Sequence, residues 1–290
     1  QINAGSANDA TLLAAAAITD ADDTTTDISG DEVFLTVGTT IGAADNVLSL
    51  AAGTLTTDSS VGNGSQHLLE VDSVGVTHVD AASSSISVYG GTWLLGSGDR
   101  IADGSTLDIQ AGATVDVNGA ENDTFIAITV SGGTLLGAGA VDADLSMSAG
   151  LSEPGNSPGV IETNDLSFSG GTYSVELDGT TAGNGAGYHD QLDVTGSVAL
   201  GSSTTLDVTV GYLPDLNDRF VIINNDGSDP VTGTFSGLAE GADFIASGIA
   251  LSISYVGGDG NDVLFGNRIG SLANDTISGA QVIPRSAFAI

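Results

Sequence analysis

The stretch "VGGDGNDVLFGN", from Val256 to Asn267, contains the residues of this chain that could most readily bind a ligand. It matches the nine-residue glycine and aspartate pattern whose repeats wind into a calcium-binding parallel β-helix. Asp259, Asn261 and Asp262 would supply oxygen ligands, which suit a hard cation such as Ca²⁺. Each ion in such a roll lies between adjacent turns, so one copy provides half of a cage. The alternative is that the phrase is the last turn of a different structure.

A second acidic segment lies near the N-terminus. The phrase "TDADDTTTD" places Asp20, Asp22 and Asp23 at loop spacing, which also suits a hard cation. No acidic segment fits the twelve-residue calcium loop that ends in Glu, and a solvated acidic face would explain the same residues. Calcium is therefore the one cofactor that the sequence suggests, and none is required.

Residues for proton transfer or nucleophilic attack are few. The three histidines are His67, His78 and His189. His189 precedes Asp190, but neighbours on a strand point to opposite faces and do not form a simple pair. "GNSPG" around Ser157 matches G-x-S-x-G, yet a nucleophile elbow needs a strand before it and a helix after it, and prolines flank this serine. We expect no catalytic residues and no enzymatic activity.

Charge excludes two classes of partner. Thirty-seven acidic residues stand against four basic ones, giving a net charge of −33. Such a chain repels phosphate backbones and anionic lipids, because binding to either depends on Lys and Arg. No apolar run approaches the roughly 20 residues that span a bilayer, so we expect neither nucleic-acid binding nor membrane insertion. A saline habitat and calcium binding would each account for this acidity.

Composition and periodicity predict an all-β fold. Forty-two glycines and five prolines are spread along a chain rich in β-branched residues. The candidate strands are 33–37, 47–57, 68–71, 85–95, 105–117 and 125–137. In several of them apolar residues alternate with Ser, Thr or Asp, as at Leu107 and Ile109, which places one face inward and one toward solvent.

A repeated phrase indicates how these strands are arranged. "YGGTWLLGSG" begins at Tyr89, "SGGTLLGAGA" at Ser131 and "SGGTYSVELDG" at Ser169, each a turn that leads into a strand. Turns recur roughly every 20 residues, the length of one coil in a parallel β-helix, or β-solenoid. A β-sandwich would also contain many short strands. The solenoid is preferred, because stacking of like coils explains why the same phrase returns.

The second half of the chain carries further short motifs in a characteristic order. They are "LSEPGNSPGV" (151–160), "YSVELDGTTAG" (173–183), "YHDQLDVTGSVAL" (188–200), "DRFVIINNDG" (218–227), "GTFSGLAEGA" (233–242) and "ISYVGGDGNDVLF" (253–265). In this order they resemble the autotransporter-associated β-strand repeat family, mainly over residues 137–266. The resemblance implies a right-handed parallel β-helix in an exported bacterial surface or extracellular protein, and it implies no catalytic residues.

We accordingly divide the chain into four regions. They are an N-terminal segment that caps the fold or takes part in assembly (1–30), solenoid coils (31–136), the repeat-like region (137–266) and a C-terminal tail (267–290). Within the first region "TLLAAAA", from Thr11 to Ala17, contains good helix formers but could equally be an alanine-rich strand.

The two ends resemble each other. "GSANDATL", from Gly5 to Leu12, recurs in altered form as "GSLANDTI", from Gly270 to Ile277, and the chain ends in the apolar "AFAI" at Ile290. Complementary ends would stack subunits head to tail into a fibre, because such a contact need not close. Coincidence in a biased composition is the alternative.

The sequence therefore predicts a non-enzymatic extracellular structural protein. It would be a cell-surface passenger, a stalk, or a self-assembling fibre or surface-layer subunit. Its partners would be other copies of the chain or components of the cell surface. An adhesin or glycan-binding β-helix is the first alternative. A polysaccharide-degrading β-helix enzyme is the second, although such enzymes need Lys or Arg to act on acidic sugars.

Overall fold

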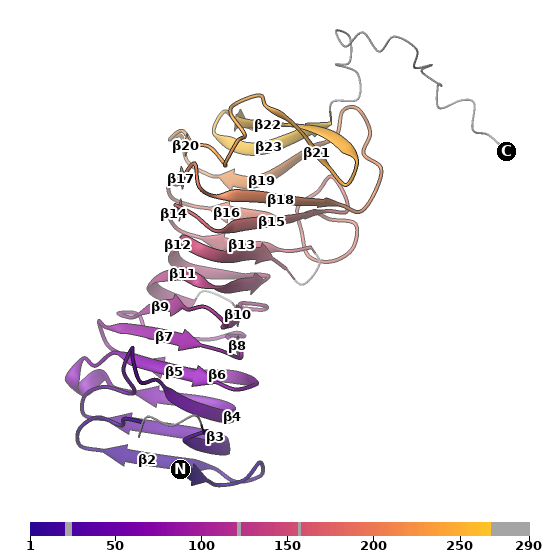
Figure 1. Cartoon of the computed structure of the whole chain (residues 1–290). Helices are drawn as coiled ribbons and strands as arrows, with labels where there is room; N and C mark the ends of the chain where they lie inside the picture. The colour runs from indigo at the N-terminus through magenta and orange to yellow at the C-terminus, as the bar shows by residue number, and fades with distance from the viewer. Residues whose placement is uncertain (21–24, 121–122, 156–157, 268–290) are drawn as a thin grey trace, which may run out of the picture.

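The computed structural model describes residues 1–20, 25–120, 123–155 and 158–267. These residues form 23 β-strands and one short 3-10 helix, Ser60–Gly62. The prediction of an all-β fold is confirmed. The strands lie in layers that follow one another from the N-terminal end to the C-terminal end (Figure 1). Within this part of the chain, no helix is long and apolar enough to cross a membrane.

One face of the stack is a ladder of ten strands whose neighbours are all parallel. In order they are β2 (Ala10–Ala14), β3 (Ile28–Val37), β4 (Leu48–Asp58), β6 (Ser73–Asp80), β8 (Thr92–Leu94), β10 (Thr114–Asp116), β11 (Asp123–Gly137), β12 (Gly139–Pro154), β15 (Thr172–Leu177) and β18 (Thr205–Val210). Thr114 pairs with Thr134 of the following layer, which agrees with the predicted spacing of the turns. Thr172 pairs with the more distant Thr205, so the last layers contain longer stretches of chain.

A second parallel ladder runs beside the first. It contains β1 (Ile2–Asn3), β5 (Gln66–Glu70), β7 (Ser85–Tyr89), β9 (Thr106–Ile109), β14 (Leu166–Phe168), β17 (Val198–Leu200) and β20 (Thr232–Gly233), together with parts of β3, β4, β11 and β12. The predicted strand 85–95 is therefore two strands, β7 and β8. Gly90 and Gly91, with φ of +60° and +62°, turn the chain between them.

The third set of strands changes direction near the C-terminal end. The strands β13 (Val160–Thr163), β16 (Gln191–Val194) and β19 (Arg219–Asn225) are parallel. The next three, β23 (Asp262–Asn267), β22 (Ile249–Gly257) and β21 (Asp243–Ala246), add to β19 in antiparallel fashion. We expected coils up to residue 266, and that was wrong for these strands. Ser247 and Gly248, both at positive φ, make a two-residue turn that can join only antiparallel strands.

The N-terminal segment belongs to the same stack. Strand β2 is parallel to β3, and Ala10 pairs with Val33, so the first part of "TLLAAAA" is a strand and not a helix. Strand β1 pairs with the first residues of β3. Residues near the start of the chain therefore form a layer of their own, beneath the layer that contains β3 (Figure 1).

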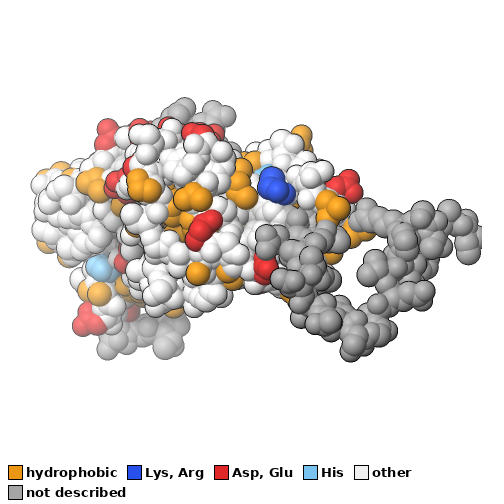
Figure 2. Space-filling model, turned by 90° about the horizontal axis from the view of Figure 1, so that it is seen from above, with side chains coloured by type: hydrophobic (Ala, Val, Ile, Leu, Met, Phe, Trp, Pro, Cys, Tyr) orange, Lys and Arg blue, Asp and Glu red, His pale blue; other side chains and the backbone are white. Residues whose placement is uncertain are grey.

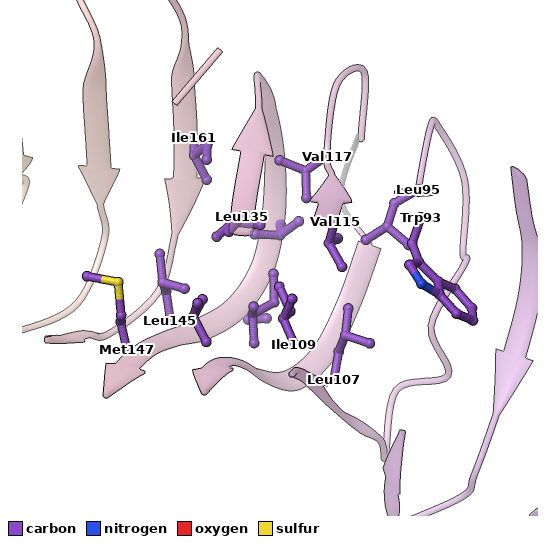
Figure 3. Close-up of a cluster of buried hydrophobic side chains, with 14 of the residues drawn as sticks. Trp93, Leu95, Leu107, Ile109, Val115, Val117, Leu135, Leu145, Met147 and Ile161 are labelled. Atoms are coloured by element: carbon purple, nitrogen blue, oxygen red, sulfur yellow. The ribbon is translucent and has the colours of Figure 1, made fainter. Parts of the chain in front are cut away.

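The interior is built from like side chains stacked in register. Val115 pairs with Trp93 in the layer before it and with Leu135 in the layer after it, and all three are buried. Figure 3 shows these side chains and their neighbours gathered between the strands. Burial alternates along the strands, as in β15, because side chains on a strand point alternately inward and outward. This confirms the inward and outward alternation inferred from the sequence.

Aromatic rings gather at the C-terminal end of the interior. Tyr173 stacks on Phe235 with ring centroids 6.2 Å apart, and Phe235 lies 6.3 Å from Tyr255. These three residues and Phe265, on β23, are all buried. The antiparallel strands therefore bring large side chains over the last parallel layer and shield its aliphatic core from water.

Candidate functional site

The loop around Asp259 lies against a second loop that follows β19. The amide nitrogen Nδ2 of Asn261 donates hydrogen bonds to the carbonyl oxygens of Gly227, at 2.8 Å, and Asp229, at 3.1 Å. The backbone N–H of Asn225 donates to Oδ1 of Asp262 at 2.9 Å. The turn 257–262 between β22 and β23 is thus bonded directly to the loop 225–230.

Two of the three predicted calcium ligands therefore have structural roles. Asp262 is buried, and its carboxylate accepts backbone hydrogen bonds from Asn225 and Asp259. Burial raises the pKa of Asp262. The nitrogen of the Asn261 side chain lies between two carbonyl oxygens, a place that a cation could otherwise take. Asp259 is exposed, and its carboxylate remains the only one of the predicted set that faces solvent.

A cavity of about 220 Å³ lies between the two loops. Gly227, Ser228 and Pro230 line it from one loop, and Asp259 and Gly260 line it from the other. On the same loop as Gly227, Oδ1 of the buried Asn225 accepts no hydrogen bond from the residues that the structure describes. Sequence reasoning missed Asn225 and Asp229. The signal was the phrase "NNDGSDP", which is rich in oxygen ligands but matches no known calcium pattern.

The second predicted acidic group is only partly described. The carbonyl oxygen of Asp20 accepts a hydrogen bond from the side chain of Asn46, whereas Asp22 and Asp23 lie outside the described residues. Among the described residues, no three His, Cys, Asp or Glu side chains converge closely enough to hold a metal ion. A cation site in this part of the chain would therefore depend on amide and backbone oxygens as well as on carboxylates.

His189 and Asp190 anchor the long loop that joins β15 to β16. The two ring nitrogens of His189 lie 3.1 Å from the carbonyl oxygens of Gly179 and Val221. The two carboxylate oxygens of Asp190 accept hydrogen bonds from the N–H groups of Gly159, at 2.6 Å, and Glu176, at 2.7 Å. The side chains bond in different directions, although the two residues lie in the loop and not on a strand.

Burial shifts the pKa values of both residues. It lowers the pKa of His189 and raises the pKa of Asp190 to about 7. Both side chains are almost fully buried, and both bond to the backbone. A base that activates a nucleophile must reach the proton it abstracts, and both ring nitrogens of His189 face backbone carbonyl groups. Ser157, the other residue considered for catalysis, lies outside the described residues.

A shallow groove of about 430 Å³ crosses the first layers of the stack. Its lining includes Ser29, Asp31, Gly53, Asp72 and Ser73, and it also includes Gly5, one of the predicted assembly residues. A Cβ on Gly53 would lie 2.8 Å from the backbone oxygen of Asp31 in the preceding layer, so a residue without a side chain fits best there.

A buried acid lies beside this groove, and sequence reasoning missed it. Glu70 is 1% exposed, and burial raises its pKa to about 8. Its Oε1 accepts a hydrogen bond from the N–H of Val71, and when protonated the carboxyl can also bond to Asp72. The signal was present in "QHLLEV", since alternation places Glu70 on the same inward side as Leu68.

The remaining assembly residues are divided between described and undescribed parts of the chain. Leu12 on β2 packs partly against the core, and its neighbour Leu13 is 82% exposed. Gly270, Ile277 and Ile290 lie outside the described residues. Comparison with known proteins adds no relative, because no protein-family model, curated protein or solved structure matches this chain.

Proposed function

We propose that this chain is a non-enzymatic extracellular structural protein built as a right-handed parallel β-solenoid. The observation that carries the proposal is the unbroken parallel ladder from β2 to β18, in which each strand is paired on both sides except at the ends. Backbone hydrogen bonds between layers and a continuous apolar interior hold such a stack together. This architecture suits a stalk, passenger, fibre or surface-layer subunit.

Surface composition supports the same role. Outward positions of the ladders carry Thr, Ser and Asp, as at Thr92, Thr114 and Asp116. Seen from the C-terminal end, apolar and acidic side chains are interspersed among other side chains and backbone (Figure 2). A net charge of −33 keeps copies soluble and makes any contact between them dependent on salt.

The location of the protein tests this proposal directly. Immunogold electron microscopy on cells that express the chain from its own gene should place the label at the cell surface or on extracellular material. Intact cells treated with a protease should lose the exposed parts of the protein. Label confined to the cytoplasm would contradict an extracellular structural role.

Assembly of copies into a fibre is a separate part of the proposal. The N-terminal strand β2, "ATLLA", is uncharged and contains no proline, so it lacks the features that normally prevent strand addition. Electron microscopy of the purified full chain would reveal fibres, and a tail deletion after residue 267 should abolish them. Dispersed particles at every salt and calcium concentration would rule out the fibre, while leaving a stalk or passenger role intact.

Glycan binding is the second candidate, because the groove near Asp31 and Asp72 spans several layers. Its hydroxyl and carboxylate groups could bond to a neutral polysaccharide. Microcalorimetry with neutral and uronic-acid polysaccharides would detect such binding, and Asp31→Ala should weaken it. Release of new reducing ends in the same samples would instead indicate the polysaccharide-degrading enzyme.

A further inference from the structure

We propose that the loops 225–230 and 257–262 together form a calcium site, in which Asn225 and Asp229 supply the oxygen ligands that complete the half-cage around Asp259. Within the turn 257–262 only Asp259 remains available as a side-chain ligand, because Asn261 and Asp262 bond to the loop 225–230. The fold places this second oxygen-rich loop opposite the turn, although the two loops are well separated in the sequence.

The first observation is an unpaired oxygen on Asn225. This residue is 1% exposed, its N–H donates to Asp262, and its side-chain nitrogen donates to the carbonyl oxygen of Asp229 at 3.0 Å. Its side-chain oxygen Oδ1 is buried and accepts no hydrogen bond from the described residues. Buried polar atoms are seldom left without a partner, and amide oxygens are regular ligands of Ca²⁺.

The second observation is the space at Gly227. A Cβ atom on this residue would lie 2.6 Å from Oδ1 of Asp229 and 3.8 Å from Oδ1 of Asn225. Both oxygens therefore lie close to the point that a side chain of residue 227 would occupy. Gly227 also lines the cavity of about 220 Å³ that Asp259 lines from the opposite loop. Gly227 thus lies close to the two oxygens on its own loop and also lines the cavity that Asp259 lines from the other loop.

The ligand set determines how tightly the ion binds. Two carboxylates, from Asp229 and Asp259, and the amide oxygen of Asn225 give a site of low charge, which backbone carbonyl oxygens and water would complete. Calcium sites in extracellular modules bind with Kd of about 10⁻⁴ to 10⁻³ M. We expect an affinity in that range and a preference for Ca²⁺ over Mg²⁺, because Mg²⁺ demands a smaller and more regular cage.

Microcalorimetry on the full chain, after treatment with a chelator, tests the site. Titration with CaCl₂ should show one saturable site, and titration with MgCl₂ should not. Ionic strength must be held constant, since a chain with a net charge of −33 attracts cations in general. A ligand that binds the folded state also raises the Tm, so Ca²⁺ should raise it in a saturable manner.

Variants assign the binding to these two loops. Gly227→Ala fills the space without changing the charge, and Gly227 does not have a positive φ that would forbid alanine. Asp229→Asn removes a carboxylate at an exposed position, so this variant should fold. We expect either change to weaken calcium binding at least about tenfold.

Asp207→Asn provides the matched control. Asp207 is an exposed residue of β18, and its substitution removes one negative charge away from the two loops. It should leave calcium binding unchanged. The proposal is overturned if no saturable calcium binding is found, or if all three variants weaken binding equally, because the second result would indicate diffuse attraction to the acidic surface.

Discussion

The hydroxyl group of Tyr173 donates a 2.7 Å hydrogen bond to the carbonyl oxygen of Ile222, which lies 49 residues further along the chain. Tyr173 is fully buried, and burial raises the pKa of its hydroxyl well above the ordinary value. It therefore remains a hydrogen-bond donor at any ordinary pH. The bond joins β15 to β19 through the interior, at the level where parallel layers give way to antiparallel strands.

Substitution Tyr173→Phe should lower the free energy of unfolding by about 1 to 2 kcal/mol, because it leaves a buried carbonyl group without this donor. Urea unfolding followed by circular dichroism measures the change. Tyr188→Phe is the control, since Tyr188 is 41% exposed and should have almost no effect. Equal stability of both variants would show that the interior bond contributes nothing.

Glu70 should make stability depend on pH. Its pKa is 4.5 in an unfolded chain and about 8 in the folded state. Between these values the folded state keeps a proton that the unfolded state has lost, so the free energy of unfolding falls as pH rises through this window. Below about pH 4.5 both states are protonated, and above about pH 8 both are ionised, so the dependence ends at each limit.

Glu70→Gln tests this dependence, because glutamine resembles the protonated carboxyl group. At pH 8 the variant should be more stable than the parent by on the order of 2 kcal/mol, and at pH 4 the two should be alike. Thermal unfolding across this pH range measures the difference. Glu162→Gln, at an exposed position on β13, is the control and should show no such trend.

His189 should stabilise the loop 178–188 against local opening. Replacing it by Leu removes the N–H that its neutral ring can donate to the carbonyl group of Gly179 or of Val221, as well as its contact with the ring of Phe220. We expect a loss of about 1 to 3 kcal/mol in the free energy of unfolding. Hydrogen exchange should quicken in the loop first. Thr180→Ala, at an exposed position of the same loop, should leave exchange unchanged.

Alanine variants of Gly91 and Gly119 should distinguish the stability cost of backbone strain from the cost of crowding. Both have positive φ, +62° and +77° respectively. A Cβ on Gly91 would lie 2.8 Å from the backbone oxygen of Glu70, whereas a Cβ on Gly119 would meet no atom within 4 Å. Gly119→Ala should cost about 1 kcal/mol from strain alone. Gly91→Ala should cost roughly 1 to 3 kcal/mol more, because it also forces adjacent layers apart. Denaturant unfolding of both variants gives the comparison.

Much of the fold could be predicted from local periodicity in the sequence. Alternation at Leu107 and Ile109 identified inward positions, and the phrase at Ser131 predicted the layer that contains β11. The final antiparallel strands were not predicted, because the turn at Ser247 has no strong sequence signal and the turn 257–262 resembles one that could also lie within a repeat. Whether a strand pairs in parallel or antiparallel fashion depends on which sheet edge is free when it joins the sheet. The sequence of that strand alone does not specify this edge.

The candidate calcium site was half predicted. The phrase around Asp259 was visible in the sequence, whereas Asn225 and Asp229 gained significance only when β19 and β23 paired and brought their loops together. The structural role of Asp190 likewise became visible only in the folded chain, where its carboxylate accepts hydrogen bonds from the N–H groups of Gly159 and Glu176.

By itself, the sequence determined the all-β class, the regular spacing of the turns, the inward and outward sides of several strands, and an acidity that disfavours nucleic acid and anionic lipid. Each of these follows from residues close together in the chain or from composition. Only the tertiary structure decided where the stack ends in antiparallel strands, which acids are buried and which loops face each other. Those outcomes depend on contacts between residues far apart in the chain, which form only when successive layers have stacked.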